Sequence, residues 1–311
     1  MQTGPIRIGT RGSRLALWQA ETVRGRLAAA EDLPEDAYEI VVIRTSGDRI
    51  QDRALLEAGG KGLFTKEIEE ALIDGSIDIA VHSAKDMPTV LPQGLILAAY
   101  LEREDVRDAL VAVGATALDD LREGAVIGTA SLRREALLRR ARPDLKVELL
   151  RGNVPTRLRK VEAGEFDATL LACAGLKRLG LDEHIAARLP VETFPPACGQ
   201  GAVVIECRED DERTRRRLAR IDHRATALAV ACERAFLGVL DGSCRTPIAG
   251  HAEIDGDRLE FRGVILSTDG CEFYEIDRSG PAAPAADIGE EAGFALRGRA
   301  PKPFLAALGI D

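Results

Sequence analysis

Short apolar runs alternate with longer amphipathic stretches along the first hundred residues. Isolated apolar runs bounded by polar residues predict strands, and an apolar side repeating at helical spacing predicts helices. The helix expected at residues 13–30, for example, has Leu15, Trp18, Val23 and Leu27 on one side. The pattern predicts strands at residues 6–10, 38–43 and 77–82, and helices at 13–30 and 64–73.

The next seventy residues repeat this plan. The pattern predicts strands at residues 109–113, 125–128, 146–149 and 168–172, with helices at 132–141 and 154–163. Ile8-Gly9-Thr10 recurs 119 residues later as Ile127-Gly128-Thr129, and the Gly75-to-Asp78 junction recurs 89 residues later at Gly164 and Asp167. The first copy is therefore 30 residues longer, and the extra length includes the glycine-rich, charged stretch at 45–62.

A different pattern follows residue 222. It predicts helices at 225–240 and 288–296, and strands at 248–254, 258–266 and 272–277, joined by Asp-Gly hairpin turns. We therefore expect two α/β domains flanking a cleft and a smaller α+β C-terminal domain. The expected boundaries are 1–101 (completed by a strand within 200–221), 102–199 and 222–311.

Composition narrows the class of protein. The 311 residues are 45% hydrophobic and 30% charged, and the net charge of −9 argues against general nucleic-acid binding. There is no apolar run of membrane-spanning length and no apolar signal segment at the N-terminus, which predicts a cytoplasmic protein without membrane association. The six cysteines lack metal-site spacing, so neither a metal nor a disulfide framework is expected.

Two strand-to-helix turns have the composition of anion sites. Residues 9–13 (GTRGS) and 128–131 (GTAS) place small and hydroxyl residues where a helix begins, and backbone N–H groups there favour negative charge. An ordinary helix cap is the alternative for either turn alone, but the repetition favours a bound anion. The run Gly59-Gly60-Lys61-Gly62 lacks the spacing and the Ser or Thr of a phosphate-binding loop, which excludes a nucleotide triphosphatase.

Two further segments carry candidate chemistry. Lys85 and Asp86 follow a buried strand, where sites of open α/β sheets form. A salt bridge is the alternative for such a pair alone, but the repeat places Gly175 opposite Asp86, so that only one half has the carboxylate. His82 is interpreted as a hydrogen-bonded core residue rather than a base. Cys244 lies in a glycine-bearing loop beside Arg245, where a cysteine can form a thiolate and act as a nucleophile. Taken alone, however, this motif favours an incidental free thiol.

Seven segments in order resemble the hydroxymethylbilane synthase (porphobilinogen deaminase) family across nearly the whole chain. They begin at Ile8 (IGTRGSRLALWQA), Gly59 (GGKGLFTKEIEEALIDGSIDIAVHSAKDMPT), Gly128 (GTASLRREA), Leu150 (LRGNVPTRLRK), Ala172 (ACAGLKRLG), Gly199 (GQGAVVIECR) and Gly242 (GSCRTPIAG). The resemblance implies a monomeric transferase of tetrapyrrole and haem biosynthesis. Its expected fold is two periplasmic-binding-protein-like α/β domains and an α+β C-terminal domain.

The resemblance also implies roles for residues. Cys244 would carry a dipyrromethane cofactor through a thioether, and Asp86 would be the catalytic carboxylate. The remaining cofactor-binding residues would be Ser13, Lys85, Thr129, Ser131, Arg133 and Arg134. The incoming porphobilinogen and the growing chain would be bound by Arg11, Gln19, Lys61, Arg151, Arg157 and Arg178.

The implied chemistry suits these residue types. Each porphobilinogen brings an acetate and a propionate, so four deaminating condensations need many fixed cations, and the arginine fork pairs well with carboxylates. Hydrolysis would then release the linear tetrapyrrole hydroxymethylbilane and leave the primer behind. The stretch at 45–62 is interpreted as a lid that excludes water, and a disordered surface loop is the alternative for this composition.

The alternative to an enzyme is a binding module. Two repeated α/β domains also fit a bilobal protein that binds or senses an organic anion without catalysis. The intact mass separates the two readings, because a binding module has no reason to carry an adduct on Cys244.

Overall fold

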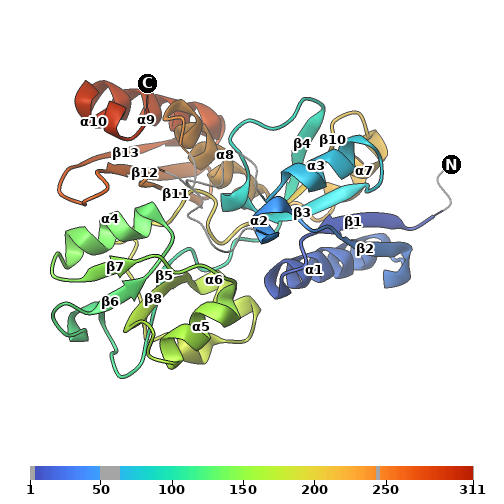
Figure 1. Ribbon diagram of the computed structural model, residues 1–311. Helices are drawn as coiled ribbons and strands as arrows, with labels where there is room; N and C mark the ends of the chain where they lie inside the picture. The colour runs from blue at the N-terminus through green and yellow to red at the C-terminus, as the bar shows by residue number, and fades with distance from the viewer. Residues whose placement is uncertain (1–3, 50–63, 243–245, 311) are drawn as a thin grey trace. The chain divides into compact units, whose positions relative to one another are not determined.

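Three β-sheets organise the residues that the computed structural model describes, which are 4–49, 64–242 and 246–310 (Figure 1). The chain divides into two compact units. The first takes in the described residues up to 103 together with 202–227, and the second takes in 104–201 and the described residues from 228 onward.

The sheet of the first unit has five strands in the order β2-β1-β3-β10-β4. These are β1 (Ile6–Thr10), β2 (Tyr38–Val42), β3 (Ile79–Ser83), β4 (Leu95–Tyr100) and β10 (Val203–Arg208). Helices α1 (Arg14–Glu31), α3 (Lys66–Ile73) and α7 (Glu212–Leu218) contact this sheet, and the short α2 (Ser46–Arg49) follows β2. Strand β10 therefore enters this sheet from more than 100 residues further along the chain, and it runs antiparallel to both neighbours.

The second unit contains another five-stranded sheet, in the order β7-β6-β8-β5-β9. Its strands are β5 (Asp108–Ala112), β6 (Val126–Gly128), β7 (Lys146–Glu148), β8 (Ala168–Ala172) and β9 (Ala187–Arg188). Its helices are α4 (Leu132–Ala141), α5 (Val154–Glu162) and α6 (Cys173–Arg178). Two strand pairs are parallel, and β5 is antiparallel to both of its neighbours, as β10 is in the first sheet.

The two sheets match residue by residue. In the first, Ile8 pairs with Ile79, and in the second Ile127 pairs with Ala168, which are the same positions under the offsets of 119 and 89. The carboxylates at the two helix-to-strand junctions also make equivalent hydrogen bonds. Asp78 accepts one from the backbone N–H of Arg7 (2.8 Å), and Asp167 accepts one from the backbone N–H of Val126 (2.7 Å). The predicted repeat is confirmed.

The third sheet is antiparallel and consists of β11 (Ile248–Asp255), β12 (Arg258–Leu266) and β13 (Phe273–Pro281). The helices of this part are α8 (Arg224–Val239), α9 (Ala285–Arg299) and α10 (Lys302–Ala307). The aromatic rings of Phe236 and Phe261 lie 5.0 Å apart in its core. On the other face of this sheet, Val264 and Leu266 belong to a buried cluster that also contains Leu138 of α4 and Leu170 of β8. The C-terminal part is therefore packed against the second α/β sheet within one unit.

The predicted fold class, two α/β sheets followed by a smaller α+β part, is confirmed. The division into three domains at residues 101, 199 and 221 stays a prediction. Of the helices in residues 4–49, 64–242 and 246–310, none is long and apolar enough to cross a membrane.

Candidate active site

The first predicted anion turn joins β1 to α1. The Ser13 hydroxyl accepts a hydrogen bond from the backbone N–H of Ala16 (3.2 Å), so it caps the helix as its position predicts. The guanidinium of Arg11 lies over the ring of Phe64, 4.2 Å from its centre. Further along α1, the buried Gln19 amide donates to the hydroxyl of Ser83 at the end of β3 (2.9 Å). Arg11, Ser13 and Gln19 thus lie at the carboxyl end of the parallel strands of this sheet.

Lys85 and Asp86 follow β3 at the same end of the sheet, in a single 3-10 turn, Ala84–Asp86. Both side chains are half-buried, between the buried residues Ala84 and Met87. The turn is held to the residue before β10, because the N–H of Ala84 donates to the carbonyl of Ala202 (3.0 Å). The backbone therefore fixes where the Asp86 carboxylate begins, while its side chain keeps access to solvent.

His82 is buried on β3, with Nε2 3.3 Å from Oε2 of the fully buried Glu206 on β10. Glu69 of α3 lies near both groups, and burial raises the pKa of its carboxyl. This buried position agrees with the interpretation of His82 as a core residue. Its two carboxylate neighbours were not anticipated from the sequence.

The second anion turn, between β6 and α4, has the same construction. The Thr129 hydroxyl accepts from the N–H of Ser131 (3.2 Å), and the Ser131 hydroxyl caps α4 by accepting from the N–H of Arg134 (3.4 Å). Gly128 is required by packing, because an added Cβ would come within 2.7 Å of Leu150 Cβ. These hydrogen bonds link Thr129, Ser131 and Arg134 within the turn where the sequence predicts an anion site.

The side chains of Arg133 and Arg134 point into the protein. Both are buried, and both donate to the carboxylate of Asp108, which is fully buried at the start of β5. Burial would raise the pKa of Asp108, but the two guanidinium groups outweigh it and hold that pKa well below its ordinary value. Burial lowers the pKa of Arg133, which its ion pair with Asp108 opposes. Asp108 was not predicted as a site residue.

Three further arginines predicted to bind substrate lie beyond the ends of β7 and β8. Arg151 and Arg157 flank the start of α5, where Arg157 Nε donates to the carbonyl of Gly152 (2.8 Å). Arg178 ends α6, and its Nη2 donates to the carbonyl of Gly201 (2.7 Å). Burial lowers the pKa of Arg178 to about 10, an effect that nearby Glu104 opposes. Lys61, Cys244 and all of the predicted lid except residues 45–49 lie outside the described residues.

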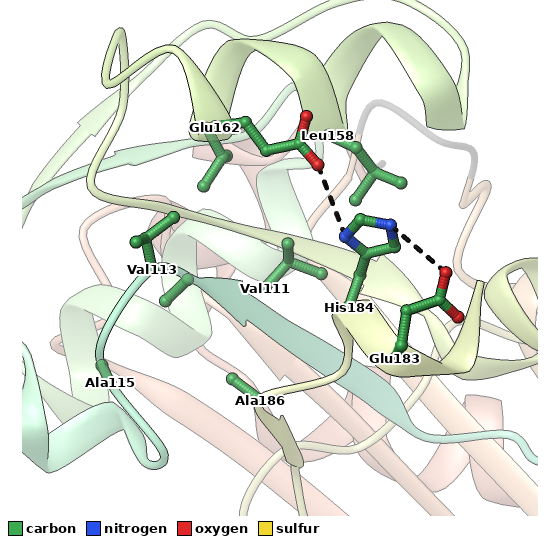
Figure 2. A pocket seen from close by; sticks show the side chains of 10 residues that line it. Val111, Val113, Ala115, Leu158, Glu162, Glu183, His184 and Ala186 are labelled. Atoms are coloured by element: carbon green, nitrogen blue, oxygen red, sulfur yellow. Dashed lines mark ion pairs between the residues drawn. The ribbon is translucent and has the colours of Figure 1, made fainter.

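A pocket of about 250 Å³ on the second unit has a different character (Figure 2). Val111, Leu158 and Val161 form part of its apolar wall. His184 lies at its edge between two carboxylates, with Nδ1 3.5 Å from Glu162 and Nε2 3.7 Å from Glu183 (Figure 2). Carboxylates at the rim would repel acidic pyrroles, and the predicted site residues do not line this pocket.

The described candidate residues share one position in the fold. They lie after the carboxyl ends of parallel strands in two matching α/β sheets, where ligands of open α/β sheets bind. Most are arginines, lysines or helix-capping serines, so these edges favour ligands that carry carboxylates. The fold is that of a repeated α/β protein, and the candidate residues at its strand ends suit small organic anions as ligands.

The family follows from comparison with known sequences. The sequence model described as "Porphobilinogen deaminase, dipyromethane cofactor binding domain" matches residues 6–216, and "Porphobilinogen deaminase, C-terminal domain" matches residues 227–298. The chain belongs to the porphobilinogen deaminase family, as its sequence segments predict.

Among its relatives are the porphobilinogen deaminases of Nitrobacter hamburgensis and Nitrobacter winogradskyi. Each is 57% identical over 297 residues, which is 96% of this chain and 94% of the relative. Among solved structures, the chain matches a periplasmic substrate-binding protein of an ABC transporter from Coxiella burnetii with a TM-score of 0.44 and 17% identity, over 74% of this chain and 96% of that one. A methionine binding protein has a TM-score of 0.44 and 16% identity over 70% of this chain and 89% of that one.

Proposed function

We propose that the chain joins four porphobilinogen molecules, with loss of ammonia, onto a dipyrromethane primer bound to Cys244, and then releases hydroxymethylbilane by hydrolysis. Membership of the family, with a match to its cofactor-binding domain over residues 6–216, carries this proposal. The cationic strand ends of both units support it, because substrate, primer and product are all polycarboxylates.

The described residues fit the primer by their donor chemistry. Arg133 and Arg134 bring two guanidinium groups to one carboxylate, and the buried Nε of Arg133 has no hydrogen-bond partner among the described residues. An unpaired buried N–H and an excess of positive charge suit an incoming carboxylate. We assign primer binding to Ser13, Lys85, Thr129, Ser131, Arg133 and Arg134. When bound, the primer would supply the free pyrrole carbon to which the first unit is joined, and each later unit would be joined to the ring added before it.

Arg11, Gln19, Lys61, Arg151, Arg157 and Arg178 are assigned to the incoming substrate and the lengthening chain. The arginine fork holds a carboxylate by two parallel hydrogen bonds and so fixes its orientation as well as its place. Orienting the substrate in this way lowers the entropic part of the barrier to condensation.

Asp86 is assigned as the catalytic group. Positive charge develops on the substrate pyrrole as ammonia leaves, and a carboxylate fixed nearby stabilises that charge. The same carboxylate accepts a proton as the new bond forms and can return it in the next cycle. Its half-buried position at the end of β3 suits both roles.

We further propose that the protein acts in the cytoplasm as a monomer, without a nucleic-acid or membrane partner. The free thiols of Cys173, Cys198, Cys207, Cys232 and Cys271 support a reducing compartment. The net charge of −9 supports the lack of nucleic-acid binding. Light scattering of the purified protein at several concentrations tests the monomer directly.

The activity itself is tested by stoichiometry. Incubation with porphobilinogen should release four ammonia molecules for each linear tetrapyrrole. Binding of porphobilinogen without ammonia release would instead favour the organic-anion-binding alternative.

A further inference from the structure

Asp108 is the centre of a buried ionic cluster. Its Oδ2 accepts from Nη2 of Arg133 (2.7 Å), and its Oδ1 accepts from Nε (3.1 Å) and Nη2 (2.7 Å) of Arg134. The amide of Gln200, itself buried, also donates to Oδ1 (3.0 Å). Two guanidinium groups thus share one carboxylate, and these residues together carry one excess positive charge.

The remaining bonds fix each guanidinium in one orientation. Nη1 of Arg133 donates to the carbonyl of Pro195 (2.6 Å), and Nη1 of Arg134 donates to the carbonyl of Leu170 on β8 (2.8 Å). Gln200 is held by the carbonyl of Val106 (2.7 Å). Among the side-chain nitrogens of Arg133 and Arg134, only Nε of Arg133 has no hydrogen-bond partner among the described residues. The cluster is rigid, positively charged and incomplete by one acceptor.

The matching sheet of the first unit shows which residue type occupies the position equivalent to Asp108. Asp108 pairs with Ala172 across β5 and β8, and Val203 pairs with Ser83 across β10 and β3. Because Ala172 and Ser83 are equivalent positions in the repeat, Val203 is the counterpart of Asp108. It is buried and apolar.

The arginines have apolar counterparts too. Ser13 and Ser131 cap equivalent helices, so Arg133 corresponds to Leu15 and Arg134 to Ala16. At the three equivalent positions the first unit therefore has an apolar trio in sequence: Val203, Leu15 and Ala16. Buried ionic triads are often no more stabilising than well-packed apolar side chains. Stability of the sheet does not explain why the second unit has charges here.

We propose that Asp108 is a positioning residue for the cofactor-binding arginines: it holds Arg133 and Arg134 in one arrangement and leaves the cluster positively charged for a ligand carboxylate. This inference rests on the proposed function, because it needs Arg133 and Arg134 to bind the primer. Asp108 itself acts through the arginines.

Two single variants test the inference, with adduct occupancy by intact mass as the readout. Asp108→Asn removes the charge, and it should lower the fraction of chains carrying the adduct at least tenfold. Because it leaves two buried cations unbalanced, it should also lower the midpoint of thermal unfolding by roughly 10 °C. Asp108→Glu keeps the charge but displaces the guanidinium groups, and should lower occupancy severalfold with a smaller thermal shift.

Asp167→Asn is the matched control. Asp167 is also paired with an arginine, Arg122, and it lies immediately before β8, whose other end, at Ala172, pairs with Asp108. This variant should lose thermal stability but keep wild-type occupancy. Wild-type occupancy in folded Asp108→Asn would overturn the inference, and so would wild-type occupancy in Asp108→Glu if Asp108→Asn does not fold.

A triple variant separates this inference from the proposed function. Asp108→Val, Arg133→Leu and Arg134→Ala together copy the apolar trio of the first unit, so the protein should fold but remain without adduct. Normal occupancy in the folded triple variant would remove the arginines from primer binding. An empty triple variant beside a fully occupied Asp108→Asn variant would keep the arginines in that role and overturn only the role of Asp108.

Discussion

Asp86, the proposed catalytic group, has no carboxylate at its counterpart in the repeat. Under the offset of 89 residues Asp86 corresponds to Gly175, which lies in α6 directly after β8. One unit therefore presents a carboxylate at this strand end, and the other presents none at the equivalent position. The asymmetry favours a catalytic role in the first unit and charge recognition in the second.

Asp86→Asn should lower turnover of porphobilinogen by about 10²–10³-fold, the range typical of a lost preorganised electrostatic partner. Attachment of the primer to Cys244 should be affected less than turnover. Asp36→Asn, an exposed aspartate in the same unit, is the control and should turn over normally. A normal rate of porphobilinogen consumption by Asp86→Asn would remove Asp86 from its assigned role.

The candidate site residues could be picked out from the sequence where they lie in a turn with a distinctive composition. Ser13, Thr129, Ser131 and Asp86 belong to such turns, and the structure places each at a strand end. Asp108 was missed because its arginine partners are 25 and 26 residues away, and only the pairing of β5 with β8 brings it to them.

At the scale of elements, the helices and strands with clear periodicity were predicted within a few residues. β4 was missed because LILAAY is a continuous apolar run without alternation, which does not distinguish a buried strand from a helix. The two-residue β9 and the six-residue α6 and α10 are too short to show a period. The strand predicted at 77–82 lies at 79–83.

Close packing at β6 gives a prediction for this element. In Gly128→Ala the new Cβ would clash with Leu150 and with Phe166, whose ring carbon would be 2.9 Å away. Such overpacking should destabilise the protein by about 1–3 kcal/mol. Equilibrium unfolding in urea measures the change. Gly238→Ala, a helical position with open space around it, is the control and should be neutral or stabilising. An unchanged midpoint for Gly128→Ala would contradict the packing of this turn.

At the scale of the whole molecule, paired carboxylates set how stability depends on pH. A hydrogen bond from Arg107 lowers the pKa of Asp105, one from Arg142 lowers that of Asp144, and the two guanidinium groups of the Arg133–Arg134 pair lower that of Asp108. A carboxyl whose pKa is lower in the folded state stabilises that state above its unfolded pKa of about 3.9. That contribution is lost as the pH falls through the folded pKa.

The free energy of unfolding should therefore be lower at about pH 3 than at about pH 6. Glu69 acts in the opposite direction, because its raised pKa gives stability at low pH that is lost as the pH rises, but the lowered carboxyls outnumber it. Urea unfolding at the two pH values measures the difference. Equal or greater stability at about pH 3 would show that these ion pairs do not control acid unfolding.

The account as a whole depends on a covalent primer at Cys244, and the intact mass of the purified protein with peptide mapping tests it most directly. We predict an adduct of two pyrrole units on the peptide that contains Cys244, with Cys173, Cys198, Cys207, Cys232 and Cys271 unmodified. Cys244→Ser should lack both the adduct and turnover. An active protein with the mass of the bare polypeptide, or turnover by Cys244→Ser without an adduct, would contradict the account.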